Sequence, residues 1–378
     1  MKLKDKKISV YARSGEIAPA GYYRILQYLN KMGTIELKVR ALLSESQFKR
    51  YLQIEKKNIF VKLLVEIITY VIITTRVSYF LICDIFRKPN FIVLSRVFVP
   101  RLTPFFFRPI INSILKKSKL IWDFDDHILE NKQITKSEFI FLSERSSKIL
   151  VIHDYLKALV TPENQHKVIL LPTTDGDMQG LDDRDEIKRN RRMLFEKEIH
   201  LIWVATSGNL PHLKRIIPIL DDTAGKVEEL YHKKLILNIV CNLPLNEKVK
   251  HLVVNNIKWS RNAAIQSMVE SHIGIMPLSD TTFSQGKGGF KLIQYMSIGL
   301  PIIASEVGFN IEIVDENSGF LINDIDDMEM WETNILKLSK TWDIWNDLSF
   351  GSYQRWKNNF SFENNYKIWE HLLEDNKQ

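Results

Sequence analysis

The segment 279–291, SDTTFSQGKGGFK, combines glycines with lysines in a pattern that suits anion binding. The residues concerned are Gly286, Lys287, Gly288, Gly289 and Lys291. The glycines would let the backbone come close to a ligand. The helix predicted to begin near Phe290 would direct free N–H groups and the positive end of its dipole toward that ligand. With two lysines at the same end, the segment predicts a diphosphate site.

Gln294 lies three residues after Lys291, so both side chains would face the same side of the predicted helix. Its amide can donate and accept hydrogen bonds, as contacts to ribose hydroxyls require. Two other phosphate-binding motifs are missing. GxGxxG is incomplete because Lys291 takes the place of the third glycine, and no GxxxxGK[ST] loop occurs. The sequence therefore does not support a dinucleotide oxidoreductase or a P-loop nucleoside triphosphatase.

A second polar group lies in the first half of the chain. Asp123, Asp125 and Asp126 follow an apolar segment, and three roles are open for them: a divalent-cation site, carboxylates that bind a substrate or move a proton, or structural capping of a loop. Arg24 is either an anion contact or a helix-surface arginine. His153, at the end of the segment 149–152, either faces the ligand or is a structural histidine whose hydrogen bonds are made within the protein or with solvent.

Composition narrows the classes of ligand and partner that the protein could bind. The net charge of +7 and the isoelectric point near 9.1 favour phosphate-bearing ligands, an anionic membrane surface or nucleic acid. No compact basic and aromatic patch occurs, so we expect no nucleic-acid partner. Cys83 and Cys241 lie far apart, which excludes a disulfide framework and cysteine metal-ligand spacing.

Short segments rich in Ile, Val and Leu alternate with helix-length segments along the whole chain, as in doubly wound α/β domains with parallel sheets. The predicted strands are Ile8–Ala12, Phe91–Ser95, Leu120–Asp123, Ile149–Ile152, Val168–Pro172, Leu201–Ala205, Leu235–Val240, Ile273–Pro277, Ile302–Ser305 and Gly319–Ile322. The polar segment DGDMQGLDDRDEIKRNRR separates two groups of strands and is typical of a linker. We predict domains at 1–175 and 198–355, a linker at 176–197, and a helix in 356–378 that packs back on the body.

The sequence GKGGFKLIQYMSIGLPIIASEVGFNIEIVDENSGFLI resembles the donor-binding segment of retaining family 4 glycosyltransferases, which have the GT-B fold. More narrowly, it resembles a bacterial subgroup with the motif GKxGFKLxQYMAxGxPVVASPVGxNxEIV. GYYRILQYL, WDFDDHI, LIWVATSGNLPHL and ESHIGIMPLSD resemble further motifs of that subgroup, in the same order. The segment 45–90 lies outside the resemblance. The broader family has two glutamates eight residues apart, where this chain has Gly286 and Gln294.

The resemblance implies two Rossmann-like domains whose parallel sheets face each other across a cleft, with the donor on the second domain and the acceptor on the first. It implies transfer of a sugar from a nucleoside diphosphate sugar to a sugar or lipid-linked acceptor, with retention, without a metal or other cofactor, in the synthesis of bacterial surface polysaccharide or glycoconjugate. A sugar-nucleotide epimerase on the same fold and a non-catalytic glycosyltransferase-like binding subunit are the alternatives.

With this resemblance, each candidate residue takes a predicted role. The catalytic candidates are Lys287, Lys291, Asp126 and Arg24. The donor-binding candidates are Gly286, Gly288, Gly289, Gln294, Gly308, Asn310 and Ser207, and Asn310 is also predicted to cap a short helix at 311–315. The acceptor-side candidates are Asp125 and His153.

Two apolar segments raise the question of whether the chain spans or touches a membrane. Four charged residues interrupt the segment 59–86, so we predict two buried or amphipathic helices there and no membrane span. The segment 104–119 mixes aromatic and basic residues and is either a surface helix that touches anionic lipid headgroups or a core-facing helix with a basic end. The N-terminal sequence lacks the apolar core of a signal peptide, and we expect a cytoplasmic protein, associated or not with the inner face of the plasma membrane.

Overall fold

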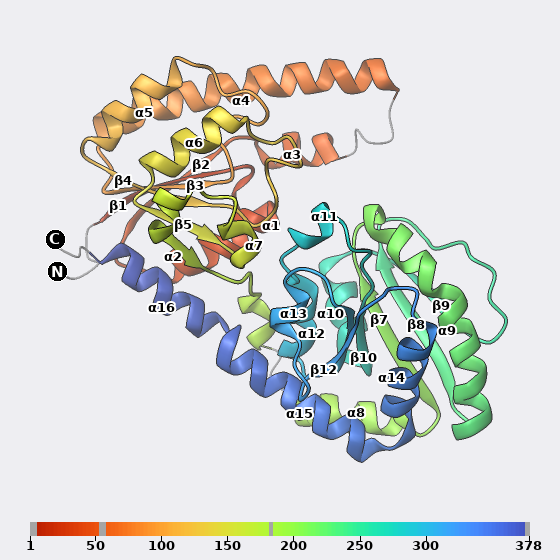
Figure 1. The fold of residues 1–378 in the computed structure, drawn as a ribbon. Coiled ribbons are helices and arrows are strands. Elements are labelled where there is room, and N and C mark those ends of the chain that lie inside the picture. The colour runs from red at the N-terminus through yellow and green to blue at the C-terminus, as the bar shows by residue number, and fades with distance from the viewer. Residues whose placement is uncertain (1–5, 53–57, 181–183, 375–378) are drawn as a thin grey trace. The chain divides into compact units, whose positions relative to one another are not determined.

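The computed structural model describes residues 6–52, 58–180 and 184–374. The chain forms two compact units (Figure 1). The first comprises Met1–Thr173 together with Asn365–Gln378, and the second comprises Thr174–Asn364. Each unit contains one sheet of six parallel strands with helices packed on it, which confirms the predicted pair of Rossmann-like α/β domains.

The sheet of the first unit has the strand order β2-β1-β3-β4-β5-β6. Its strands are β1 Lys7–Ala12, β2 Glu36–Ala41, β3 Phe91–Ser95, β4 Lys119–Asp123, β5 Lys148–Val151 and β6 Val168–Leu170. Its helices are α1 Pro19–Gly21, a π-helical turn Tyr22–Leu26, α2 Gln27–Lys31, α3 Glu45–Leu52, α4 Ile59–Arg87, α5 Phe107–Leu115, α6 Lys136–Arg145 and α7 Asp154–Lys157. The central strands β1, β3 and β4 are almost wholly buried, as expected for strands covered on both faces.

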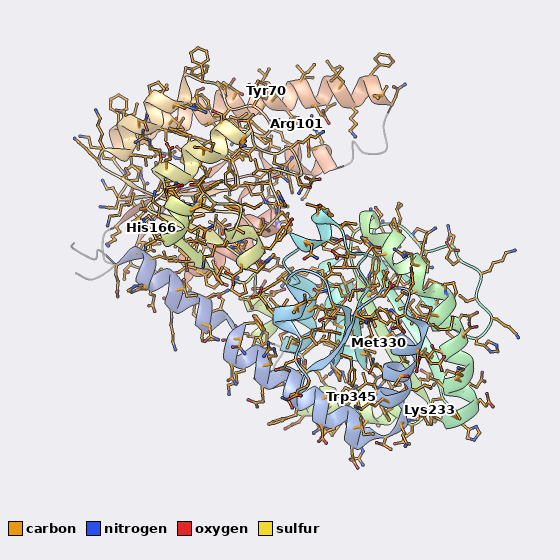
Figure 2. All side chains as sticks on the ribbon, in the orientation of Figure 1. Tyr70, Arg101, His166, Lys233, Met330 and Trp345 are labelled. Carbon is orange, nitrogen blue, oxygen red and sulfur yellow. The ribbon has the colours of Figure 1, made fainter. Side chains whose placement is uncertain are left out.

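The sheet of the second unit has the order β12-β11-β10-β7-β8-β9. Its strands are β7 Glu198–Val204, β8 Lys234–Cys241, β9 Val253–Lys258, β10 Ile273–Met276, β11 Ile302–Ser305 and β12 Gly319–Ile322. Its helices are α8 Arg184–Phe195, α9 Leu210–Tyr231, α10 Arg261–Glu270, α11 Thr282–Gln285, α12 Phe290–Ser297, α13 Asn310–Ile313, α14 Met328–Lys340 and α15 Trp342–Asn359. The tryptophans Trp331 and Trp345 are fully buried in its core (Figure 2 labels Trp345).

The predicted strands all overlap observed ones, but the sequence did not predict β2 and β9. Both are edge strands, each paired with a single neighbour. Their sequences, ELKVRA and VVNNIK, are rich in polar residues and mainly exposed or half-buried, so they lack the continuous apolar run that marks a buried strand. Polar and charged side chains are a usual way to protect a sheet edge from further pairing.

The segment predicted as a linker contains the helix α8, which packs on the second unit. Its apolar residues are few, and of these Phe195 is buried in the core while Met193 is 68% exposed. The guanidinium of Arg191 is also buried and donates to the carbonyls of Val269 (2.9 Å) and Ile298 (2.9 Å). Burial lowers the pKa of Arg191 to about 9. Arg191 takes a buried position that an apolar residue usually occupies in a helix. The segment therefore lacks the apolar pattern of a helix, and its sequence resembles a loop.

The helix α16, Phe362–Leu373, belongs to the first unit from Asn365 onward. The ring of Trp369 is fully buried, and its Nε1 donates to the carbonyl of Arg24 at 2.9 Å. The Nδ2 of Asn365 donates to the carbonyl of Pro172 at 2.6 Å. The last helix therefore closes the core of the unit that contains the first strand.

The segment 59–86 forms one helix, α4, of 29 residues, rather than the two predicted. The side chains of Ile73, Val77, Leu81 and Asp84 are buried against the unit. Most apolar side chains of its first half are exposed, among them Phe60 at 78% and Leu64 at 58%. Within the described ranges, no helix is long and apolar enough to cross a membrane.

The segment 104–119 contains a short helix, α5, that lies beside α4 (Figure 1). Phe107, Ile111 and Ile114 are buried, so this helix faces the core on one side. Phe105, just before it, is 86% exposed.

Candidate functional site

A pocket of about 250 Å³ opens in the second unit where β7 and β10 end. The carboxyl ends of parallel strands are where open α/β sheets bind ligands. The loop 286–289 and the first turn of α12 border this pocket. The predicted residues that line it are Lys287, Gly288, Gly289 and Lys291. Residues 287–289 and Lys291 therefore lie around one cavity.

The glycine loop holds a backbone conformation that depends on Gly289. This residue has φ +57°, in the left-handed region, and a Cβ there would collide with Ile313 Cδ1. Gly289 is the N-cap of α12, and no side chain caps the helix. An uncapped N-terminus at the mouth of a pocket leaves the dipole end available to an anion. The helix ends as predicted, with Gly299 at φ +70° followed by Pro301.

Lys291 belongs to a network of polar side chains that the sequence did not reveal. Its Nζ donates to Gln294 Oε1 at 2.8 Å, and Gln294 Nε2 donates to Asp175 Oδ2 at 2.7 Å. Arg261 forms ion pairs with Asp175 at 2.9 Å and with Asp177 at 3.0 Å. The amide of Gln294 is therefore oriented from both sides, with its oxygen toward Lys291.

Burial shifts the pKa of two members of this network. It lowers the pKa of Lys291 to about 8, partly offset by the nearby Asp175 carboxylate. Burial also raises the pKa of Asp175 to about 6, against the hydrogen bond from Gln294. No local motif marks Asp175, because it lies more than a hundred residues before Gln294. Only the fold brings the two together.

Lys287 lines the same pocket as Lys291. Its Nζ donates to Asn209 Oδ1 and lies 5.2 Å from the ring centre of Phe283. His212, on the first turn of α9, accepts a hydrogen bond from the backbone N of Ser279 at its Nδ1, at 3.1 Å. Burial, Lys287 and Arg215 together lower the pKa of His212. The imidazole is thus kept neutral beside a cationic pocket.

The other predicted donor-binding residues support the loop or lie near it, and the pocket lining does not include them. Gly286 ends α11. Gly308, at φ +57°, donates its N–H to Gln285 Oε1 at 3.1 Å. Ser207 exchanges hydrogen bonds with Asn242, at 2.7 Å and 3.0 Å. Gln294 lies one layer deeper, behind Lys291.

Asn310 does not cap the short helix as predicted. It is the first residue of α13, it is buried, and its Nδ2 donates to the carbonyl of Ser305 at 3.0 Å. The amide therefore ties the turn after β11 to the end of that strand. The N-cap position belongs to Phe309, which offers no capping side chain.

Arg24 is not an exposed anion contact in the first unit. It is fully buried, and its guanidinium forms an ion pair with Asp123 at 2.7 Å. It also donates to the carbonyl of Leu171 at 2.6 Å and to Thr173 Oγ1 at 3.0 Å. Burial raises the pKa of Asp123 despite this partner. The pair joins the π-helical turn to β4, which is a structural role.

Asp125 and Asp126 form ion pairs with Arg96, at 2.6 Å and 2.5 Å. Arg96 follows β3 and has φ +65°, a left-handed conformation that is uncommon for arginine. The sequence did not single it out. A pocket of about 270 Å³ at the strand ends of the first unit includes Arg96, Asp125 and Ser95 in its lining. Asp125 therefore does face a cavity, on the unit predicted to bind the acceptor.

His153 lies outside that lining and is buried. It is the N-cap residue of α7, and its ring stacks on Tyr155 with centres 6.1 Å apart. In residues 6–52, 58–180 and 184–374, no group of three or more His, Cys, Asp or Glu side chains could hold a metal ion.

Comparisons with known proteins bear on both units. Residues 203–341 match the family model described as glycosyl transferases group 1. No curated protein matches the chain. A glycosyltransferase from Rickettsia africae is similar in fold, with TM-score 0.62 and 13% identity over 97% of this chain and 98% of that one.

Two further solved structures share the fold. Anabaena HepE, in complex with UDP-glucose, has TM-score 0.60 and 12% identity over 97% of this chain and 99% of that one. A UDP-forming trehalose-phosphate synthase from Burkholderia xenovorans has TM-score 0.60 and 11% identity over 97% and 98%. The segment 203–341, which contains every lining residue of the pocket at the ends of β7 and β10, thus matches the group 1 glycosyl transferases, and the chain has the two-domain GT-B fold of glycosyltransferases.

Proposed function

We propose that the protein transfers a sugar from a nucleoside diphosphate sugar to an acceptor, with retention of configuration and without a metal ion, in the synthesis of bacterial surface polysaccharide or glycoconjugate. The observation that carries the proposal is the pocket at the ends of β7 and β10, where the uncapped α12, Lys287 and Lys291 converge. The solved complexes of the similarly folded HepE with UDP and with UDP-glucose support the class of donor.

The geometry suits a leaving diphosphate. Negative charge grows on this group as the glycosidic bond breaks, so cationic contacts there strengthen toward the transition state and raise the turnover rate. Lys291 is prepared for that role because Gln294 accepts from its Nζ and holds the side chain at the mouth of α12. Gln294 itself is held by Asp175, so its part in the site is to position the Lys291 side chain.

The first experiment identifies the nucleotide. A ligand that binds only the native state raises the unfolding temperature with the logarithm of its saturation. A panel of nucleoside diphosphates should contain one that gives a clear shift, and UDP is the first to test. If no member of the panel shifts the transition, the pocket does not bind a nucleoside diphosphate.

The second experiment tests whether the diphosphate is bound at Lys291. Lys291→Ala should lower turnover by about 100-fold, the effect of one preorganised charge-stabilising donor. Lys248→Ala, an exposed lysine of the same unit, should leave turnover unchanged. The loss should be the same with and without a chelator. Full turnover of a folded Lys291→Ala protein, or rescue of chelated enzyme by a divalent ion, would contradict the assignment.

A further inference from the structure

The first unit contains two pockets that share part of their lining. The strand-end pocket, described above, measures about 270 Å³. A second cavity of about 340 Å³, here called the helix groove, lies along α4 and the loop after β3. Arg13, Tyr51 and Pro100 line both. The two cavities are therefore neighbours with a common wall.

The helix groove is mainly apolar. Its lining includes Leu63, Ile67, Tyr70, Ile73 and Leu102, and Figure 2 labels Tyr70. Its acidic residue, Glu66, is ion-paired with Arg101 at 2.9 Å, and Figure 2 labels Arg101. With this pair neutralised, the mainly apolar lining favours a hydrocarbon chain over a polar ligand.

The strand-end pocket is different in character. It lies where β1, β3 and β4 end, at the edge where parallel sheets bind ligands. Ser95, Arg96, Asp125 and Gln133 contribute polar groups to its lining. These side chains offer both donors and acceptors, as the hydroxyl groups of a sugar require.

Arg13 stands at the junction of the two cavities. Its guanidinium lies over the ring of Tyr51, 4.7 Å from the ring centre. Its Nε is buried and makes no hydrogen bond within the described part of the chain. A buried donor without a partner is costly unless a ligand satisfies it, and a charged donor favours an anion.

We propose that the first unit binds an amphiphilic acceptor with three parts in a fixed order. Its apolar chain occupies the helix groove, an anionic group such as a phosphate contacts Arg13, and its polar head, which receives the sugar, occupies the strand-end pocket. The inference rests on the proposed function only in naming this ligand an acceptor. The order of the parts follows from the two linings and from the place of Arg13 between them.

The first test measures binding of n-alkyl phosphates of increasing chain length to the full chain, by calorimetry below the critical micelle concentration and without any donor. Affinity should rise about fourfold for each methylene buried, until the chain outgrows the groove. Affinity that does not depend on chain length would overturn the proposal.

A matched pair of variants locates the chain. Ile67 and Ile68 are neighbours on α4 with similar exposure, 52% and 48%, but only Ile67 lines the groove. Ile67→Ser should lower the affinity for the longest alkyl phosphate by about tenfold, whereas Ile68→Ser should leave it unchanged. Equal losses in both variants would mean that the amphiphile lies on the outer surface of α4, and would overturn the proposal.

A third variant tests whether Arg13 contacts the anionic group of the ligand. Arg13→Gln should weaken every alkyl phosphate by about 10- to 100-fold while the gain per methylene stays the same. Unchanged affinity in a folded Arg13→Gln protein would overturn the proposal. Because these measurements use no nucleotide, they fail or succeed independently of the nucleoside diphosphate panel, which tests the second unit alone.

Discussion

Lys291 is half-buried as a residue, and burial of its ammonium group lowers the pKa to about 8 from an ordinary value of about 10.5. Below pH 8 the side chain is charged and can hold a diphosphate. As pH rises through about 8 it loses this charge, so nucleotide affinity should fall between about pH 7 and pH 9. Lys291→Arg keeps its charge over this range and should remove most of the fall. Dissociation constants measured across the range would show this, and parallel curves for both proteins would exclude Lys291 as the titrating group.

Glu138 is a second buried titratable group, on the first turn of α6. Burial raises its pKa to about 7, although Thr103 donates to its Oε1. The folded protein therefore binds a proton more tightly than the unfolded chain, and this contribution to stability is lost as pH rises through about 7.

Glu138→Gln mimics the neutral acid and has no such dependence. The two proteins should have similar free energies of unfolding at about pH 5. At about pH 8 the variant should be the more stable, by on the order of 3 kcal/mol. Urea unfolding at both pH values measures the difference, and a wild-type protein that loses no stability relative to the variant would contradict it.

At the residue scale, the sequence predicts the parts of the site that follow one another along the chain. Lys287, Gly289 and Lys291 surround one pocket because a strand, a loop and a helix in succession carry them. Asp175 and Arg96 were not predicted, because their partners are distant in sequence. Arg24 was misassigned, since nothing in its neighbourhood shows that Asp123 lies buried beside it.

Among the elements, α4 departs most from its prediction. Its buried face carries Ile73, Val77 and Leu81, and a second apolar stripe on its exposed side includes Phe60, Leu64 and Ile68. A helix that is apolar on two sides requires a second apolar environment. The sequence could not distinguish the buried stripe from the exposed one, because both have helical spacing.

We expect the exposed stripe of α4 to lie on the surface of a bilayer, with basic residues near α5 attracting anionic headgroups. The protein should bind anionic vesicles at low salt, and salt should release part of it. Replacing Phe60, Leu64 and Ile68 with serine should weaken binding by about tenfold or more. Vesicle flotation measures both effects, and no binding to anionic vesicles at low salt would exclude this surface.

At the scale of the whole molecule, the main feature is the path that the chain takes from one unit to the other and back. The first unit is built from both ends of the described chain, because α16 returns to it after the second unit is complete. Trp369→Ala would leave a large cavity beside Tyr28, and should destabilise the first unit by about 3 to 5 kcal/mol. Phe350→Ala, at an exposed aromatic residue of α15, is the control.

The stabilisation of the second unit by a nucleotide should survive in Trp369→Ala, because the pocket lies wholly in that unit. Calorimetry with and without nucleotide separates the destabilisation of the first unit from the stabilisation of the second. Equal destabilisation of both units would show that the last helix supports the entire molecule and not the first unit alone.

The return of α16 also sets an order of events on the ribosome. Chains emerge from the N-terminus and domains fold as units when their residues are available. The residues 174–364 are contiguous, so the second unit can fold as soon as they have emerged. The first unit, although synthesised earlier, lacks Trp369 until after that point, and its core beside Arg24 and Tyr28 stays incomplete. The nascent chain therefore carries an unfinished first unit throughout synthesis of the second.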